Sequence, residues 1–124
     1  MTGNVAKLHL DSLVKEQNCK CHYCAAQMTF KTEYKFKDTD ATVEHLVDKW
    51  SSPKHVRSDA RSNLVAACFK CNNSRGNSRN KIARDYYQSI INKKNLRIKA
   101  ANISSKALYK KFGAIPQELF KTAV

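Results

Sequence analysis

The stretch TVEHLVDKWSSPKHVRSDARSNLVAACFKCNNSRG, residues 42–76, decides the fold that we predict for this chain. It begins with a β-branched apolar run that contains a Glu-His pair, and it ends with a second apolar run that leads into Cys-x-x-Cys-Asn. Short apolar runs of this kind, bounded by polar segments, are typical of strands. The stretch therefore predicts two short strands joined by a long polar loop over residues 48–63.

A second Cys-x-x-Cys pair lies upstream of this stretch. Cys21 and Cys24 form the first pair, and Cys68 and Cys71 form the second. A gap of two residues lets both sulfurs of a pair face one ion, and thiolates favour zinc over magnesium. Four thiolates leave no open position for water, so we predict a structural zinc site without chemistry of its own. Cys19 is either a small buried side chain or an alternative ligand, and the spacing to Cys24 favours Cys21 instead.

Length and charge limit the class of protein. The chain has 124 residues and a formal net charge of +13. That length suits one domain, whose modest core would gain from a structural metal. Most of the excess positive charge lies after residue 74, which is typical of a basic module beside a more neutral body. A polyanionic partner is therefore expected, with nucleic acid first.

The sequence shows no membrane or export signal. No apolar run approaches the length of about 18 residues that a transmembrane helix needs, and the N-terminus lacks the apolar segment of a signal peptide. We therefore expect a cytoplasmic protein that does not bind membranes. A reducing compartment agrees with cysteines that act as metal ligands or free thiols rather than as disulfides.

Helices and one further strand are predicted around the central stretch. Apolar residues at helical spacing predict helices over residues 5–17, 80–93 and 105–112. Ser78 is expected to cap the second helix, and Gly113 to end the third. Alternation of apolar and polar residues over residues 28–36 predicts a half-buried strand. Pro116 is expected to begin a final turn.

Glu44, His45 and Asn72 offer the groups that phosphodiester hydrolysis needs. A histidine titrates near neutral pH, so His45 is the natural base for activating water. Glu44 and Asn72 carry hard oxygen ligands that suit Mg²⁺ or Mn²⁺. Neighbours in a regular strand point to opposite faces, so a bend is expected at the strand end. The structural alternative makes His45 a core residue, and Asn63 and Asn72 caps or turn residues.

The order of these motifs resembles the zinc-containing branch of the HNH endonuclease family. The resemblance covers residues 19–79 and rests on Cys-x-x-Cys, Thr-Val-Glu-His, Asn-Leu-Val-x-Ala-Cys-x-x-Cys-Asn and Ser-Arg-Gly, in that order. It implies an α+β protein with a ββα-metal core, in which two strands and a helix hold one divalent ion, together with a four-cysteine structural zinc site and flanking helices. Compact members often come from phages or bacteria, so we expect a source of that kind and, for a phage protein, the host cytoplasm.

The resemblance also implies roles for single residues. His45 falls on the general base, and Asn63 on the residue that braces the loop and orients the base. Glu44 and Asn72 fall on the ligands of the catalytic Mg²⁺ or Mn²⁺ ion, which makes the chain a His-Asn-Asn variant. The family more often has Asp before the base, and Glu44 is one methylene longer.

We therefore predict a metal-dependent DNA endonuclease that acts on double-stranded DNA as a monomer or homodimer. Residues 1–80 would form the zinc-stabilised core, and residues 81–124 a basic helical extension of the same compact unit. Arg75 should share a helical face with Asn72 and bind phosphate. Further nucleic-acid contacts are expected from Arg79, Lys81 and Arg84.

Other functions stay open at this point. The main alternative is a zinc-knuckle module that binds nucleic acid without cutting it. The Glu44-His45 pair together with Asn72 favours the nuclease, because binding alone requires none of these residues. A sequence-specific restriction or homing role and a zinc-held interaction domain are further alternatives.

Overall fold

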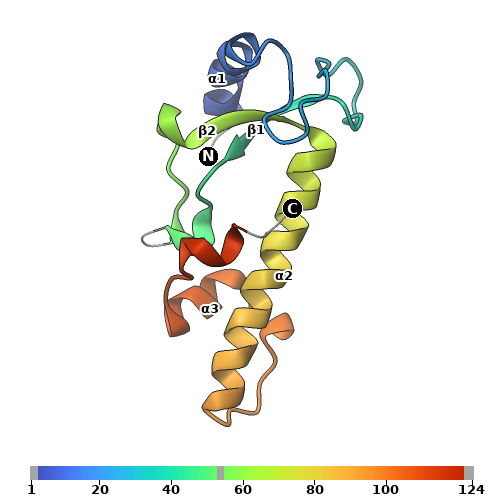
Figure 1. Ribbon diagram of the computed structural model, residues 1–124. Coiled ribbons are helices and arrows are strands. Elements are labelled where there is room, and N and C mark those ends of the chain that lie inside the picture. Colours follow the sequence, from blue (N-terminus) through green and yellow to red (C-terminus); the bar gives the residue numbers. More distant parts are fainter. Residues whose placement is uncertain (1–2, 53–54, 122–124) are drawn as a thin grey trace.

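The structure is a computed structural model that describes residues 3–52 and 55–121, with side chains from residue 8 onward (Figure 1). Its sheet consists of two antiparallel strands, β1 (Ala41–His45) and β2 (Leu64–Cys68). Ala41 pairs with Cys68, and His45 pairs with Leu64. The two predicted strands and the α+β class are confirmed.

The N-terminal helix α1 (Gly3–Glu16) packs on the sheet and confirms the helix predicted over residues 5–17. Its Leu13 and Val14 are buried in a first core with the inner faces of both strands. After the helix, the Gln17 side chain donates to Ala66 O at 2.8 Å and accepts from Ala66 N at 2.9 Å. This amide therefore covers the outer edge of β2, which would otherwise expose unpaired backbone groups.

Residues 28–36 do not form the predicted strand, so that prediction is wrong. Only isolated bridges occur there, from Lys20 to Gln27 and from Thr29 to Asp40. Met28 is buried, but residues 29–39 are all exposed. The apolar and polar residues alternate, but of the apolar set only Met28 reaches a core. We call this segment, residues 29–40, the aromatic loop.

The long helix α2 (Phe69–Lys93) begins directly after β2 rather than near residue 80. Ser78 therefore lies inside the helix and does not cap it, which corrects that prediction. The first turns of α2 lack apolar residues at helical spacing, so the sequence pattern did not indicate where the helix begins. Their polar side chains face the site and the solvent rather than a core. In Figure 1, α2 runs from the sheet to the opposite end of the molecule, across the boundary expected at residue 80.

A second core lies around the C-terminal half of α2, beside α3 (Ser105–Phe112). Its buried members are Trp50, Ala83, Tyr87, Ile91, Ala100, Leu108, Ile115 and Phe120. Gly113 ends α3 with a φ of +90°, and Pro116 precedes a final 3-10 turn at Gln117–Phe120, as predicted. Trp50 brings the long loop after β1 into this core, so the loop is anchored at both ends.

Candidate active site and metal centre

The four cysteines of the two Cys-x-x-Cys pairs come together. The Sγ atoms of Cys21, Cys24, Cys68 and Cys71 all lie within 4.8 Å of one another. The Sγ atoms of Cys24 and Cys68 are 3.9 Å apart. A tetrahedral zinc site with Zn–S bonds of about 2.3 Å has edges of about 3.8 Å, so the cluster fits a zinc ion. Cys19 packs against the first core outside the cluster, which leaves Cys21 as the ligand.

Hydrogen bonds lower the pKa of a cysteine thiol in this cluster, whereas burial raises it. Burial raises the pKa of the Cys21 thiol, but N–H groups of Cys24, Cys68 and Tyr23 outweigh it and lower this pKa to about 7. Burial and the neighbouring thiols raise the pKa of Cys68 and Cys71. A metal ligand must be a thiolate, so a bound cation is what allows all four to ionise together.

Glu44 is a buried carboxylate whose two oxygens differ in their hydrogen bonding. It is 6% exposed, and its Oε1 accepts from His45 N at 3.0 Å and from Arg79 at 3.4 Å. Its Oε2 is buried and has no hydrogen-bond donor among the described residues, with Arg75 Nε at 3.8 Å. Burial raises the pKa of Glu44, and the two arginines oppose that shift. An orphaned buried oxygen of this kind calls for an explanation, and a metal ion supplies one.

His45 faces a carboxylate that lies outside the sequence motifs. The residue is 3% exposed, and its Nε2 lies 2.9 Å from Asp59 Oδ1. Burial lowers the pKa of His45, and Asp59 partly offsets this effect. Asp59 lies in the long loop, and neither its spacing nor its neighbours in sequence connect it with His45. Residues 46–47 bend directly after β1, at the place where a bend was expected.

Two asparagines hold the surroundings of this pair. Asn63 accepts from Val47 N at 2.9 Å and donates to Val47 O at 3.1 Å and to Ser58 O at 2.9 Å, so its amide joins both ends of the loop. Asn72, in the first turn of α2, donates Nδ2 to Thr42 Oγ1 at 2.8 Å and to Val43 O at 3.2 Å. The start of α2 is thereby held against β1 beside Glu44.

Comparison with known proteins agrees with this geometry. Residues 21–78 match the sequence profile of a family described as HNH endonuclease. Residues 21–78 therefore belong to the HNH endonuclease family. The HNH segment contains all four cysteines of the cluster, both strands and the start of α2, so the ββα-metal fold is confirmed. Membership of this family supports a nuclease-type function.

A curated relative matches about half of the chain. The chain is 34% identical over 65 residues to the CRISPR-associated endonuclease Cas9 of Corynebacterium diphtheriae. The match covers 52% of this chain but only 5% of Cas9, so the chain corresponds to a small part of that relative's length. No solved structure gives a significant match. Within the described residues, no helix has the length and apolar character needed to cross a membrane.

Arg79, one of the four residues expected to contact nucleic acid, is buried. Arg79 is 5% exposed and donates to His45 O at 3.2 Å and to Leu46 O at 3.3 Å. It also lies 3.4 Å from Glu44 Oε1 and 3.5 Å from Asp48 Oδ2. Its expected contact with nucleic acid is therefore corrected to a structural role, because the guanidinium is enclosed by its own chain.

The other three basic residues differ in how many contacts their side chains make within the protein. Arg84 Nη1 donates to Ala100 O and Ile103 O, so much of this guanidinium is also used internally. Lys81 is exposed and pairs with Asp85 at 2.8 Å. The Arg75 guanidinium lies 4.0 Å from the centre of the Tyr23 ring, at the rim of the HNH site.

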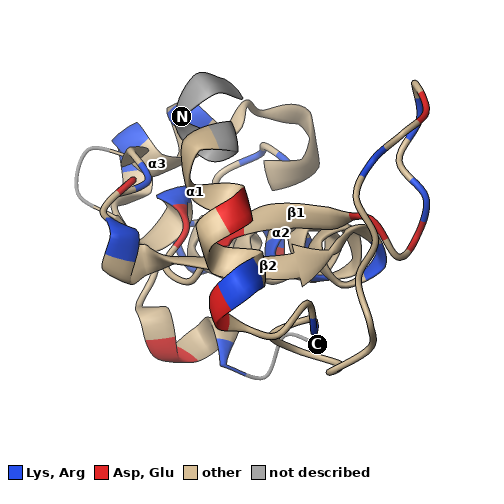
Figure 2. Cartoon of the chain, turned by 90° about the horizontal axis from the view of Figure 1, so that it is seen from above, with Lys and Arg blue, Asp and Glu red and all other residues tan. Residues whose placement is uncertain are grey.

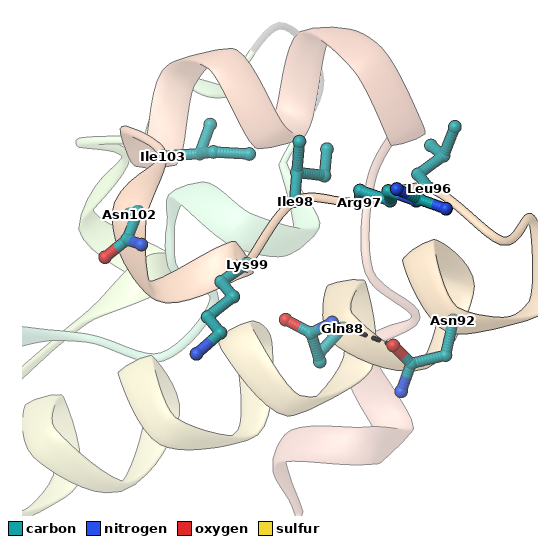
Figure 3. A pocket seen from close by; sticks show the side chains of 8 residues that line it. All are labelled: Gln88, Asn92, Leu96, Arg97, Ile98, Lys99, Asn102 and Ile103. Carbon is teal, nitrogen blue, oxygen red and sulfur yellow. Dashed lines mark hydrogen bonds between the residues drawn. The ribbon is translucent and has the colours of Figure 1, made fainter.

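Among the hollows on the described part of the surface, one borders the cysteine cluster and another borders α2. The first, of about 620 Å³, borders the cysteine cluster and is lined by Arg75, Lys70, Tyr23 and residues 38–39 of the aromatic loop, among others. The second, of about 700 Å³, lies along the C-terminal half of α2 (Figure 3). Its lining side chains are Gln88, Asn92, Leu96, Arg97, Ile98, Lys99, Asn102 and Ile103. Cations are the only charged groups among them.

Proposed function

We propose that the chain is a metal-dependent endonuclease that hydrolyses phosphodiester bonds in DNA, with His45 as the general base. The observation that carries the proposal is the buried Glu44 carboxylate with an orphaned Oε2, next to His45 and within an HNH segment. Glu44 and Asn72 would hold one Mg²⁺ or Mn²⁺ ion. Non-catalytic binding of nucleic acid would not require a carboxylate and an imidazole that are both buried.

The proposed base has a defined tautomer. A carboxylate only accepts hydrogen bonds, so the contact with Asp59 places the proton of neutral His45 on Nε2. Nδ1 then carries the lone pair that takes a proton from water. Because burial lowers the pKa of His45, the ring stays in this basic form at neutral pH. Asp59 thus acts as a positioning residue.

The oxygen atoms that face the proposed catalytic ion are set by the fold. Asn72 uses its Nδ2 on Thr42 and Val43, which leaves its Oδ1 as the ligand atom. Glu44 offers its Oε2. When bound, a divalent ion supplies positive charge for the departing 3′ oxygen, so that 5′-phosphate and 3′-hydroxyl ends result. Arg75 would bind the scissile phosphate from the rim.

Zinc would have a structural role in this proposal. Cys68 ends β2 and Cys71 lies in the first turn of α2, so the cluster fixes the strand-helix junction that carries Asn72. Further phosphate contacts would come from exposed cations on and after α2, namely Lys81, Arg97 and Lys99.

The test is a plasmid nicking assay with Mg²⁺ or Mn²⁺, carried out on the wild type and on His45→Ala. We expect the wild type to convert supercoiled DNA into open circles and the variant to lose this activity. His9→Ala, which removes a histidine of α1, is the matched control and should cut normally. A wild type that binds DNA but never cuts it, or a His45→Ala variant that cuts normally, would refute the proposal. One site cuts one strand, so linear product would indicate a homodimer or two successive events.

A further inference from the structure

The aromatic loop exposes large aromatic side chains. Tyr34 is 93% exposed, Phe30 51% and Phe36 42%. Clustered apolar groups on a surface mark interaction sites more often than chance. The loop projects from the body of the molecule, with charged residues along its length (Figure 2). Its basic residues are Lys31, Lys35 and Lys37.

Hydrogen bonds join the two ends of the loop, which we call its neck. Asp40 is fully buried, and its carboxylate accepts from Thr29 Oγ1 at 2.7 Å and from Lys37 N at 2.8 Å. Backbone bonds from Thr29 N to Thr39 O and from Ala41 N to Thr29 O close the neck at 3.0 and 2.8 Å. The loop is therefore held out from the surface by specific contacts, and residues 33–35 bend at its tip.

The three aromatic rings are not equivalent. Phe36 stacks on Phe69, the first residue of α2, with ring centres 5.1 Å apart and planes at 3°. Lys31 Nζ lies 4.3 Å from the centre of the same ring. Phe36 thus has an internal function, which is to pin one side of the loop to α2. Within the described part of the chain, Tyr34 and Phe30 have no such ring contact.

The base of the loop lines the hollow beside the cysteine cluster, which also reaches Arg75. Asp38 and Thr39 of the loop line the hollow of about 620 Å³ that also reaches Lys70 and Arg75. Arg75 Nε lies 3.8 Å from Glu44 Oε2. The hollow therefore connects the base of the loop with Arg75, the residue beside the proposed catalytic carboxylate, and a strand bound at Arg75 has a route along the hollow toward the loop.

We propose that Tyr34, assisted by Phe30, stacks on unpaired bases of the DNA strand beside the scissile phosphate. The lysines of the loop would contact the flanking phosphates. Every base has a flat π face, so such stacking tolerates any sequence, whereas the bases of an intact duplex are stacked on one another. The preferred substrate is therefore DNA with unpaired bases, such as a gap, a fork or a branch. This inference rests on the proposed nuclease function and narrows its substrate class.

The test compares binding of the full-length wild type, Tyr34→Ala and Tyr34→Phe to two labelled DNAs. One DNA is a complete duplex, and the other has the same sequence with a short single-stranded gap. Fluorescence anisotropy without added divalent ion gives Kd without cleavage. Tyr34→Ala should raise Kd for the gapped DNA roughly 5- to 150-fold, since stacking on one base contributes about 1–3 kcal/mol. Tyr34→Phe keeps the ring and should bind as the wild type does.

Two further measurements separate stacking from charge. Thr32→Ala changes an exposed neighbour without removing a ring, and it should leave Kd unchanged. In Tyr34→Ala, the slope of log Kd against log salt should be that of the wild type, whereas Lys35→Ala should reduce the slope. A 2-aminopurine placed in the gap should change its fluorescence on binding to the wild type but not to Tyr34→Ala.

The outcomes distinguish this inference from the function on which it rests. If the wild type nicks DNA but Tyr34→Ala binds gapped DNA as tightly as the wild type does, the stacking proposal is overturned and the nuclease stands. An equal loss of affinity for gapped DNA and duplex also overturns it. If no nuclease activity is found but the gap-specific loss appears, the nuclease proposal fails and stacking stands. Failure of the wild type to bind either DNA overturns both.

Discussion

Replacing Arg79 by methionine removes the central charge of the buried network at the end of β1. The variant leaves Glu44 and Asp48 without their arginine, and it leaves His45 O and Leu46 O without a donor. Removing one partner of a buried ion pair costs about 3–5 kcal/mol. The four contacts of Arg79 are long, at 3.2 to 3.5 Å, so we expect the lower end, about 3 kcal/mol.

For a domain of this size, a loss of that order lowers Tm by roughly 10–15 °C. Thermal unfolding followed by circular dichroism, with zinc present throughout, measures the shift. Arg75→Met is the matched control, because Arg75 faces the same carboxylate from a position that is 18% exposed. This control should lose less stability than Arg79→Met, because its distance to the Glu44 carboxylate is longer, at 3.8 Å, and its side chain is more exposed. A Tm for Arg79→Met close to that of the wild type would show that the buried network does not stabilise the fold.

Four further predictions concern the catalytic and zinc sites. Burial lowers the pKa of His45 below its ordinary 6.5, so nicking should persist just below that pH and fall as the pH drops through the lowered pKa. Asp59→Asn removes the partner that raises this pKa, so the acidic limb of the pH profile should move to lower pH while the rate falls; an unshifted limb would count against the contact. Glu44→Gln should abolish metal-dependent nicking and keep zinc, and activity that survives would exclude Glu44 as a ligand. Cys24→Ser should lose bound zinc in elemental analysis and melt at lower temperature, whereas Cys19→Ser should retain one zinc per chain.

Local sequence patterns predicted the elements whose structure depends on residues that are close together in sequence. In each Cys-x-x-Cys pair the two-residue gap turns both sulfurs to one side, and the two pairs meet where His22 N donates to Ala66 O of β2. The apolar runs around His45 and Leu64 became the paired strands. Gly113 ended its helix because a φ of +90° is accessible to glycine.

The errors came from elements whose partners are far away in sequence. Alternation over residues 28–36 shows which side chains share a face, but it does not show whether a sheet or core covers that face. In the described residues only Met28 of this set enters a core, and Phe36 stacks on Phe69. The start of α2 carries no apolar period because its side chains face the site. Asp59 reaches His45 across 14 positions, and Arg79 reaches Glu44 across 35, so no local pattern indicates either contact.

The continuity of α2 fixes a length. One helix carries Asn72 and Arg75 at the sheet and Gln88 and Asn92 at the basic hollow near its other end. At a rise of about 1.5 Å per residue, Arg75 and Asn92 are separated by roughly 26 Å along the axis. Both cores pack against this rod, so the spacing cannot adjust as it would across a flexible linker. A polyanion that contacts both ends of the helix must therefore present negative charges separated by this distance. The distance is equivalent to about eight nucleotides of a stacked strand.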